Sequence, residues 1–180
     1  MNVETALPPP PVEDRPKLGL FLLYLLMALG MFMAILDIQI VAASLGEIQA
    51  GLSASADEIA WVQTSYLVAE VIMIPLSGFL ARALSIRWMF VLSSAGFTLA
   101  SLACALVTTI EGMIVARTVQ GFLGGAMIPT VYAASFMMFG RSRQAAVTAM
   151  TSFIVTLAPT VGPVLGGWIT GVLSWHWLFL

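Results

Sequence analysis

Charged residues are scarce in this chain of 180 residues: Asp, Glu, Lys and Arg together make up 9%, against roughly 25% in an ordinary soluble domain. Apolar residues make up 60%, and the mean hydropathy is +1.01. A soluble domain of this size needs polar side chains to cover its surface, and a disordered chain contains far fewer apolar ones. The composition therefore excludes both classes and indicates an integral membrane protein.

Basic residues, cysteine and histidine are also scarce. Seven Lys and Arg residues stand against nine Asp and Glu residues, so no basic field is present to bind nucleic acid. With Cys104 and His176 as the only residues of their kinds, neither an intrachain disulfide nor a zinc site of His and Cys is expected. No nucleophile–base set occurs either. We therefore expect no enzyme, no metal and no organic cofactor.

Five long apolar stretches follow a polar, proline-rich segment, residues 1–17, which we interpret as a cytoplasmic tail. Each stretch reaches the ~20 residues that a helix needs to cross a hydrocarbon core ~30 Å thick. Only helices can cross as open segments, because lipid cannot satisfy backbone hydrogen bonds. The sequence thus predicts an all-α transmembrane bundle over residues 18–180, with spans at about 18–45, 59–80, 88–107, 113–139 and 145–173.

The basic residues outside the spans predict the orientation. All six lie in the tail or in the second–third and fourth–fifth connections: Arg15, Lys17, Arg82, Arg87, Arg141 and Arg143. The other connections carry only acidic charges. Because basic residues concentrate on the cytoplasmic side, we expect a cytoplasmic N-terminus and a multi-pass protein of the cytoplasmic (inner) membrane.

Asp37, Glu70 and Arg117 lie inside predicted spans, where a charge is costly and a function is the default interpretation. At ~1.5 Å per residue, Asp37 lies roughly 12 Å below the outer end of its span, and Arg117 lies roughly 6 Å into its own. The two can pair if these spans are neighbours. Arginine stays charged and stabilises a carboxylate, so separation of the pair would favour the neutral acid and give a proton switch. A structural ion pair that fixes helix register is the alternative.

Glu70 lies near the midplane and has no evident basic partner. Three roles fit it equally: contact with a substrate, carriage of a second proton, or a hydrogen bond to a neighbouring helix. The sequence does not choose between them.

The fifth span combines small residues with prolines. Ala158, Gly162 and Gly166 are spaced by four residues, which lets another helix approach closely. Pro159 and Pro163 remove backbone donors and are expected to bend the helix. This span is therefore predicted to pack tightly against a neighbour.

Several segments carry a family resemblance. Residues 36–46 keep the Leu-Asp, Ile-Val and later Leu of Leu-Asp-x-Thr-Ile-Val-Asn-Val-Ala-Leu-Pro, and Arg117, Gln120 and Gly121 match Arg-x-x-Gln-Gly. The motif Gly-x-x-x-Gly-Pro-x-x-Gly-Gly is matched by Ala158, Gly162, Pro163, Gly166 and Gly167. In this order the segments resemble the major facilitator superfamily, specifically its fourteen-span drug:proton antiporters of the EmrB/QacA type.

Two further segments depart from the pattern of that family. The cytoplasmic loop motif Gly-x-Leu-Ala-Asp-Arg-x-Gly-Arg-Arg keeps Gly78 and Arg87, but Arg82 replaces its acid and Ser85 its second glycine. His176 stands where the family has the arginine of Trp-Arg-Trp-x-Phe. A charge relay through the loop acid is therefore not expected.

The resemblance implies a fold and a function. The five spans would form most of the N-terminal six-helix half of a major facilitator fold, apparently truncated before span six. The function would be proton-coupled export of hydrophobic or cationic drugs, or other small molecules, by alternating access, with Asp37, Arg117 and Glu70 in proton coupling. Some relatives use a periplasmic adaptor protein as a partner. The alternative is a truncated, non-transporting fragment or split subunit of such a transporter.

Overall fold

The structure is a computed structural model that describes residues 18–180, so the predicted tail lies outside the described residues. Its long helices are α1 (Leu18–Ala43), α3 (Ala56–Leu84), α4 (Ile86–Leu106), α5 (Ile110–Met138) and α6 (Gln144–Val172), joined by the short helices α2 (Leu45–Leu52), η1 (Arg141–Arg143) and η2 (Trp175–Phe179). All five long helices are long and apolar enough to cross a membrane. Residues 18–180 contain no strand. The prediction of an all-α membrane fold is confirmed.

Local signals set the helix ends. Ser55 forms a capping box at the start of α3, because its hydroxyl accepts from the Glu58 amide while the Glu58 carboxylate accepts from the Ser55 amide. The Thr109 hydroxyl caps α5 through the Gly112 amide. The helix α1 ends at Ala43, two residues before the predicted end, and α2 begins after Ser44.

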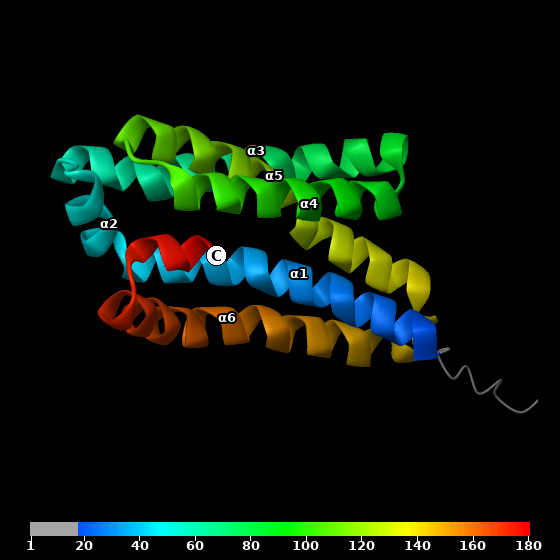
Figure 1. Cartoon of the computed structure of the whole chain (residues 1–180). Helices are drawn as coiled ribbons and strands as arrows, with labels where there is room; N and C mark the ends of the chain where they lie inside the picture. The colour runs from blue at the N-terminus through cyan, green and yellow to red at the C-terminus, as the bar shows by residue number, and fades with distance from the viewer. Residues whose placement is uncertain (1–17) are drawn as a thin grey trace, which may run out of the picture.

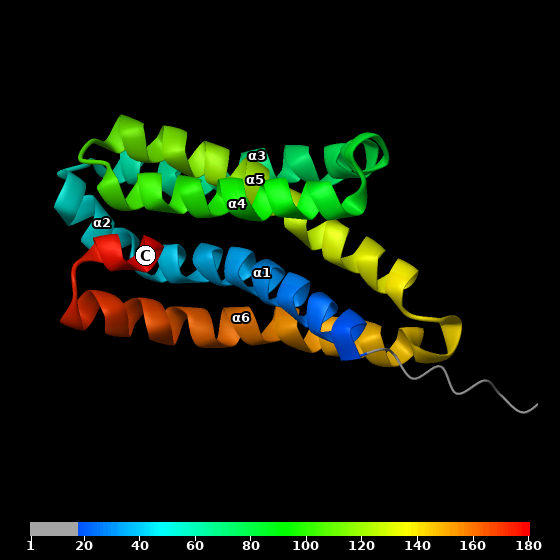
Figure 2. The same ribbon diagram turned by 45° about the vertical axis from the view of Figure 1, so that its right-hand side comes forward.

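The helices form two groups that are joined through α5 (Figures 1 and 2). In one group α5 packs along α3 and α4, and in the other α6 packs along α1. The second half of α5 runs from the first group towards α6, and α1 packs against α5 between them. The start of α1, the α3–α4 link and the α5–α6 link all lie at one end of the bundle.

Glycines permit close approaches between the helices. A Cβ at Gly125 of α5 would lie 2.8 Å from the Glu70 carbonyl oxygen of α3, and a Cβ at Gly166 of α6 would lie 2.8 Å from the Ile40 carbonyl oxygen of α1. Both distances are shorter than any normal contact, so a larger residue would push the helices apart. The helix α6 stays a single helix from Gln144 to Val172 through both of its prolines.

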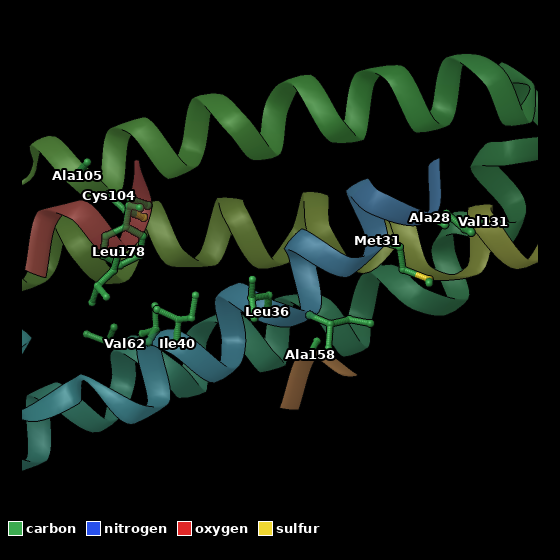
Figure 3. Close-up of a cluster of buried hydrophobic side chains, with 14 of the residues drawn as sticks. Ala28, Met31, Leu36, Ile40, Val62, Cys104, Ala105, Val131, Ala158 and Leu178 are labelled. Carbon is green, nitrogen blue, oxygen red and sulfur yellow. The ribbon is translucent and has the colours of Figure 1, made fainter. Parts of the chain in front are cut away.

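A largely apolar core extends along much of α1. Figure 3 shows its side chains, which come from all five long helices and from η2. Large apolar residues such as Leu22, Leu26 and Leu29 instead point outward from α1 and are about half exposed. An apolar exterior around a packed interior is what a lipid solvent requires.

Candidate functional site

Asp37 of α1 and Arg117 of α5 are in contact inside the bundle. Arg117 Nη1 donates to Asp37 Oδ2 over 2.5 Å. Arg117 is 0% exposed and Asp37 is 8% exposed, so water screens the ion pair little. The packing of α1 against α5 thus brings together two residues that are 80 positions apart in the chain.

Gln120 closes this pair into a three-residue polar network. It follows Arg117 by three residues, so both side chains leave the same face of α5. Its Oε1 accepts from Arg117 Nη1 over 2.7 Å, and its Nε2 donates to Asp37 Oδ1 over 3.1 Å. The Cys104 thiol of α4 lies 3.6 Å from the same Gln120 oxygen. Both oxygens of Asp37 therefore accept a hydrogen bond from α5.

The remaining surroundings of Arg117 are neutral. Its Nε donates to the Val62 carbonyl oxygen of α3 over 3.4 Å. The Tyr66 ring centroid lies 4.2 Å from the guanidinium carbon, and the Phe179 ring centroid of η2 lies 5.8 Å from it. Arg117 Nη2 has no hydrogen-bond partner among residues 18–180. The guanidinium is thus enclosed by one carboxylate, one amide, one carbonyl group and two aromatic rings.

Glu70 is buried at 7% exposure but lies outside this network. It sits one turn after Tyr66 on α3, where its backbone meets Gly125 of α5. Within residues 18–180 its side chain makes no hydrogen bond and no ion pair. The structure therefore does not join Glu70 to Asp37 and Arg117.

The other motif residues fall into two groups. Ala158, Gly162 and Gly166 are buried, and the two glycines face α1 beside Gln39 and Ile40. Exposed positions are Pro163, Gly167, Gly78, Arg82 and Arg87, and neither arginine forms an ion pair within the described part of the chain. The buried half of the α6 motif thus makes the contact with α1, close to Asp37.

A mostly apolar hollow of about 400 Å³ opens beside Asp37 between α1, α4 and η2. Met33, Phe97, Leu102 and Leu178 contribute to its walls. Among residues 18–180, Asp37 is its one ionisable lining residue. The hollow therefore places Asp37 beside a space that is lined mostly by apolar side chains.

Sequence reasoning missed Tyr66, Phe179 and the Val62 carbonyl group. Helical spacing offers a signal for Tyr66, because it precedes Glu70 by four residues and must share its face of α3. Every residue has a backbone carbonyl group, so the residue type of Val62 gives no signal that its carbonyl oxygen accepts a hydrogen bond from Arg117.

The profile of the Major Facilitator Superfamily matches residues 20–180. This chain belongs to the major facilitator superfamily. Its five long helices are accordingly part of a major facilitator fold, and its match is to the N-terminal part of an EmrB-type member.

Similar members of the superfamily include three resistance proteins. The chain is 51% identical over 154 residues to the colistin resistance protein EmrB of Acinetobacter baumannii, and 34% identical over 169 residues to the fatty acid resistance protein FarB of Neisseria gonorrhoeae. It is 38% identical over 154 residues to the probable multidrug resistance protein EmrY of Escherichia coli K12. These matches cover 86%, 92% and 86% of this chain but only 30%, 33% and 30% of the relatives, so the chain spans about a third of their length.

Proposed function

We propose that this protein takes part in proton-coupled export of hydrophobic or cationic drugs, or of other small molecules, by alternating access. Membership in a transporter superfamily and relatives named for resistance to drugs, colistin or fatty acids support this function. The observation that carries the proposal is the buried network of Asp37, Arg117 and Gln120 between α1 and α5.

Asp37 is the proton carrier in this mechanism. A neighbouring guanidinium stabilises the carboxylate, and loss of that contact in a buried site favours the neutral acid. Arginine keeps its own charge throughout, because its side chain does not lose a proton in proteins. Gln120 can hydrogen-bond to Asp37 in both states, because its amide is neutral and both donates and accepts. Glu70 would carry a second proton or contact the substrate.

The α6 motif would control the outer half of the bundle. Gly162 and Gly166 contact α1 at Gln39 and Ile40, two and three residues beyond Asp37. A change at Asp37 that shifts α1 therefore acts directly on this contact. We propose that the close α1–α6 packing seals the outward side.

The end of the bundle with the basic connections would face the cytoplasm. Arg82, Arg87, Arg141 and Arg143 lie there, at the end where α1 begins. The short helices α2 and η2 then lie at the end of the bundle that faces the outer side of the cytoplasmic (inner) membrane. The coupling ion would be H⁺, with no cofactor, and a periplasmic adaptor protein would be a partner on that outer side.

The test is transport by the protein expressed from its complete gene. Ethidium, a fluorescent lipophilic cation, would be followed in proteoliposomes under an imposed pH gradient. We expect Asp37→Asn to abolish gradient-driven transport, because the amide cannot carry the proton. The matched control is Asp57→Asn, which changes an exposed carboxylate in the first turn of α3 and leaves transport intact. Undiminished gradient-driven transport by Asp37→Asn would overturn the coupling role.

A further inference from the structure

Tyr66 of α3 contacts Arg117 and the helix α1 that carries Asp37. Its side chain is 0% exposed, and its ring lies 4.2 Å from the guanidinium carbon of Arg117. Its hydroxyl donates to the carbonyl oxygen of Ala34 over 3.4 Å, three residues before Asp37 on α1. One side chain thus touches the guanidinium on α5 and the helix that carries the carboxylate.

Arg117 would lose its counter-ion when Asp37 takes a proton. Asp37 is its only anionic partner within residues 18–180. The other hydrogen-bond acceptors are the neutral Gln120 amide and the Val62 carbonyl group, and Nη2 has none in the described part of the chain. A buried cation without a counter-ion is costly, whereas an aromatic face attracts a cation most strongly where water is excluded.

We propose that Tyr66 is a positioning residue whose ring holds the Arg117 guanidinium in place while Asp37 carries a proton. This inference rests on the proposed proton coupling and deepens it. In the ion pair the carboxylate offsets the guanidinium charge, so the ring contact is weaker there and strengthens once Asp37 is neutral. The proton enters on an Asp37 oxygen and leaves from it, and Arg117 exchanges none.

The elements packed around this site carry few other buried titratable groups. The helix α6 has none. The buried ionisable side chains of the other elements are Tyr24 and Asp37 on α1, Tyr66 and Glu70 on α3, Cys104 on α4 and Arg117 on α5. The half-buried or exposed ones are Asp57, Glu58 and Arg82 on α3, Arg87 on α4, Glu111 and Tyr132 on α5, and His176 on η2. A probe of this site must therefore report on Asp37 separately from Glu70.

Dicyclohexylcarbodiimide provides such a probe, because it is hydrophobic and reacts with protonated carboxyl groups. The protein from the complete gene would be treated across a pH series in liposomes, and mass spectrometry of its peptides would quantify modification at Asp37 and Glu70 individually. The apolar hollow beside Asp37 gives the reagent access. The measurement needs no transported substrate, so it is independent of the ethidium assay.

A series of substitutions at position 66 distinguishes the effect of the aromatic ring face on the Asp37 midpoint from the effects of the hydroxyl group and of side-chain volume. We expect Tyr66→Phe to keep the Asp37 midpoint of the parent. Phenylalanines with one, two and three ring fluorines keep the shape and progressively weaken the ring face, so the midpoint should move stepwise to lower pH. Tyr66→Leu should move it by about one pH unit, a tenfold fall in proton affinity. The direction follows because only the protonated state depends strongly on the ring.

Each outcome decides the proposal. A midpoint that fluorination leaves unchanged overturns the role of the ring, even if the leucine variant does not fold. An equal shift in Tyr66→Phe and Tyr66→Leu would assign the effect to the hydroxyl bond with Ala34 and also overturn it. If modification of Asp37 in the unsubstituted protein does not change with pH, the proposed proton coupling itself is overturned. Tyr132→Leu, roughly 22 Å further along α5 than Arg117, is the control and should change nothing.

Discussion

The contact between α6 and α1 makes a sharp prediction at two adjacent glycines. A Cβ added to Gly166 would lie 2.8 Å from the Ile40 carbonyl oxygen and 3.1 Å from the Ser44 hydroxyl oxygen, whereas a Cβ added to Gly167 meets nothing within 4 Å. The first distance is 0.6 Å short of the 3.4 Å at which ordinary contact begins (3.4 − 2.8). Because the obstacle is backbone, the α1–α6 pair must separate to admit the methyl group.

The magnitude follows from comparing the two substitutions. Gly→Ala inside a helix gains about 1 kcal/mol at either position, so this gain cancels in the difference. Overpacking at Gly166 costs about 1–3 kcal/mol. At about 2–4 °C per kcal/mol, the Gly166→Ala protein should unfold about 2–12 °C below the Gly167→Ala protein.

Thermal unfolding of the purified protein in detergent, followed by loss of the monodisperse peak in size-exclusion chromatography, measures this difference. Each variant would be compared at matched concentration in the same detergent. Equal unfolding temperatures for the two variants would refute the close approach of α6 to α1.

Two further predictions concern stability in the same assay. Ser85 joins α3 to α4 with φ 70° and ψ 151°, a backbone conformation that essentially only glycine adopts and that costs other residues about 1–3 kcal/mol. We therefore expect Ser85→Gly to raise the unfolding temperature. An unchanged or lower unfolding temperature would contradict the assigned strain. The buried Tyr24 hydroxyl of α1 hydrogen-bonds to the Thr151 hydroxyl of α6, so Tyr24→Phe should cost about 0.5–1.5 kcal/mol. That cost should largely vanish in a Thr151→Val background, and its persistence there would show that the bond is not its source.

Hydropathy alone predicted the five helices, because lipid leaves no other way to satisfy a crossing backbone. The depth of the ion pair in the membrane could be calculated only once the ends of the helices were known. Counted from the observed end of α1 at Ala43, Asp37 lies roughly 9 Å deep, and counted from the start of α5 at Ile110, Arg117 lies roughly 10 Å deep. The sequence placed these residues roughly 6 Å apart in depth, because apolar runs do not mark where a helix begins or ends.

The surroundings of the pair were less accessible to sequence reasoning. Phe179 reaches Arg117 because η2 turns back into the bundle, where the Ser101 hydroxyl donates to its carbonyl oxygen over 2.8 Å. Such a return depends on tertiary packing and on no local signal in the segment. The strained Ser85 was visible only as a departure from the glycine of the family motif. Its conformation came from the structure.

The polar network and the two close helix crossings occupy the same turns of the bundle. Gly121, the residue after Gln120, packs on the backbone of Tyr66, while Gly162 packs on Gln39, two residues beyond Asp37. Close crossings leave little room for α5 to slide on α3 or for α6 to slide on α1. Movement between the two helix groups should therefore concentrate at the α1–α5 contact, where Asp37 and Arg117 form the ion pair. Under the proposed coupling, protonation of Asp37 would therefore act at the contact that joins the two helix groups, and loss of the ion pair there would favour a change in their arrangement.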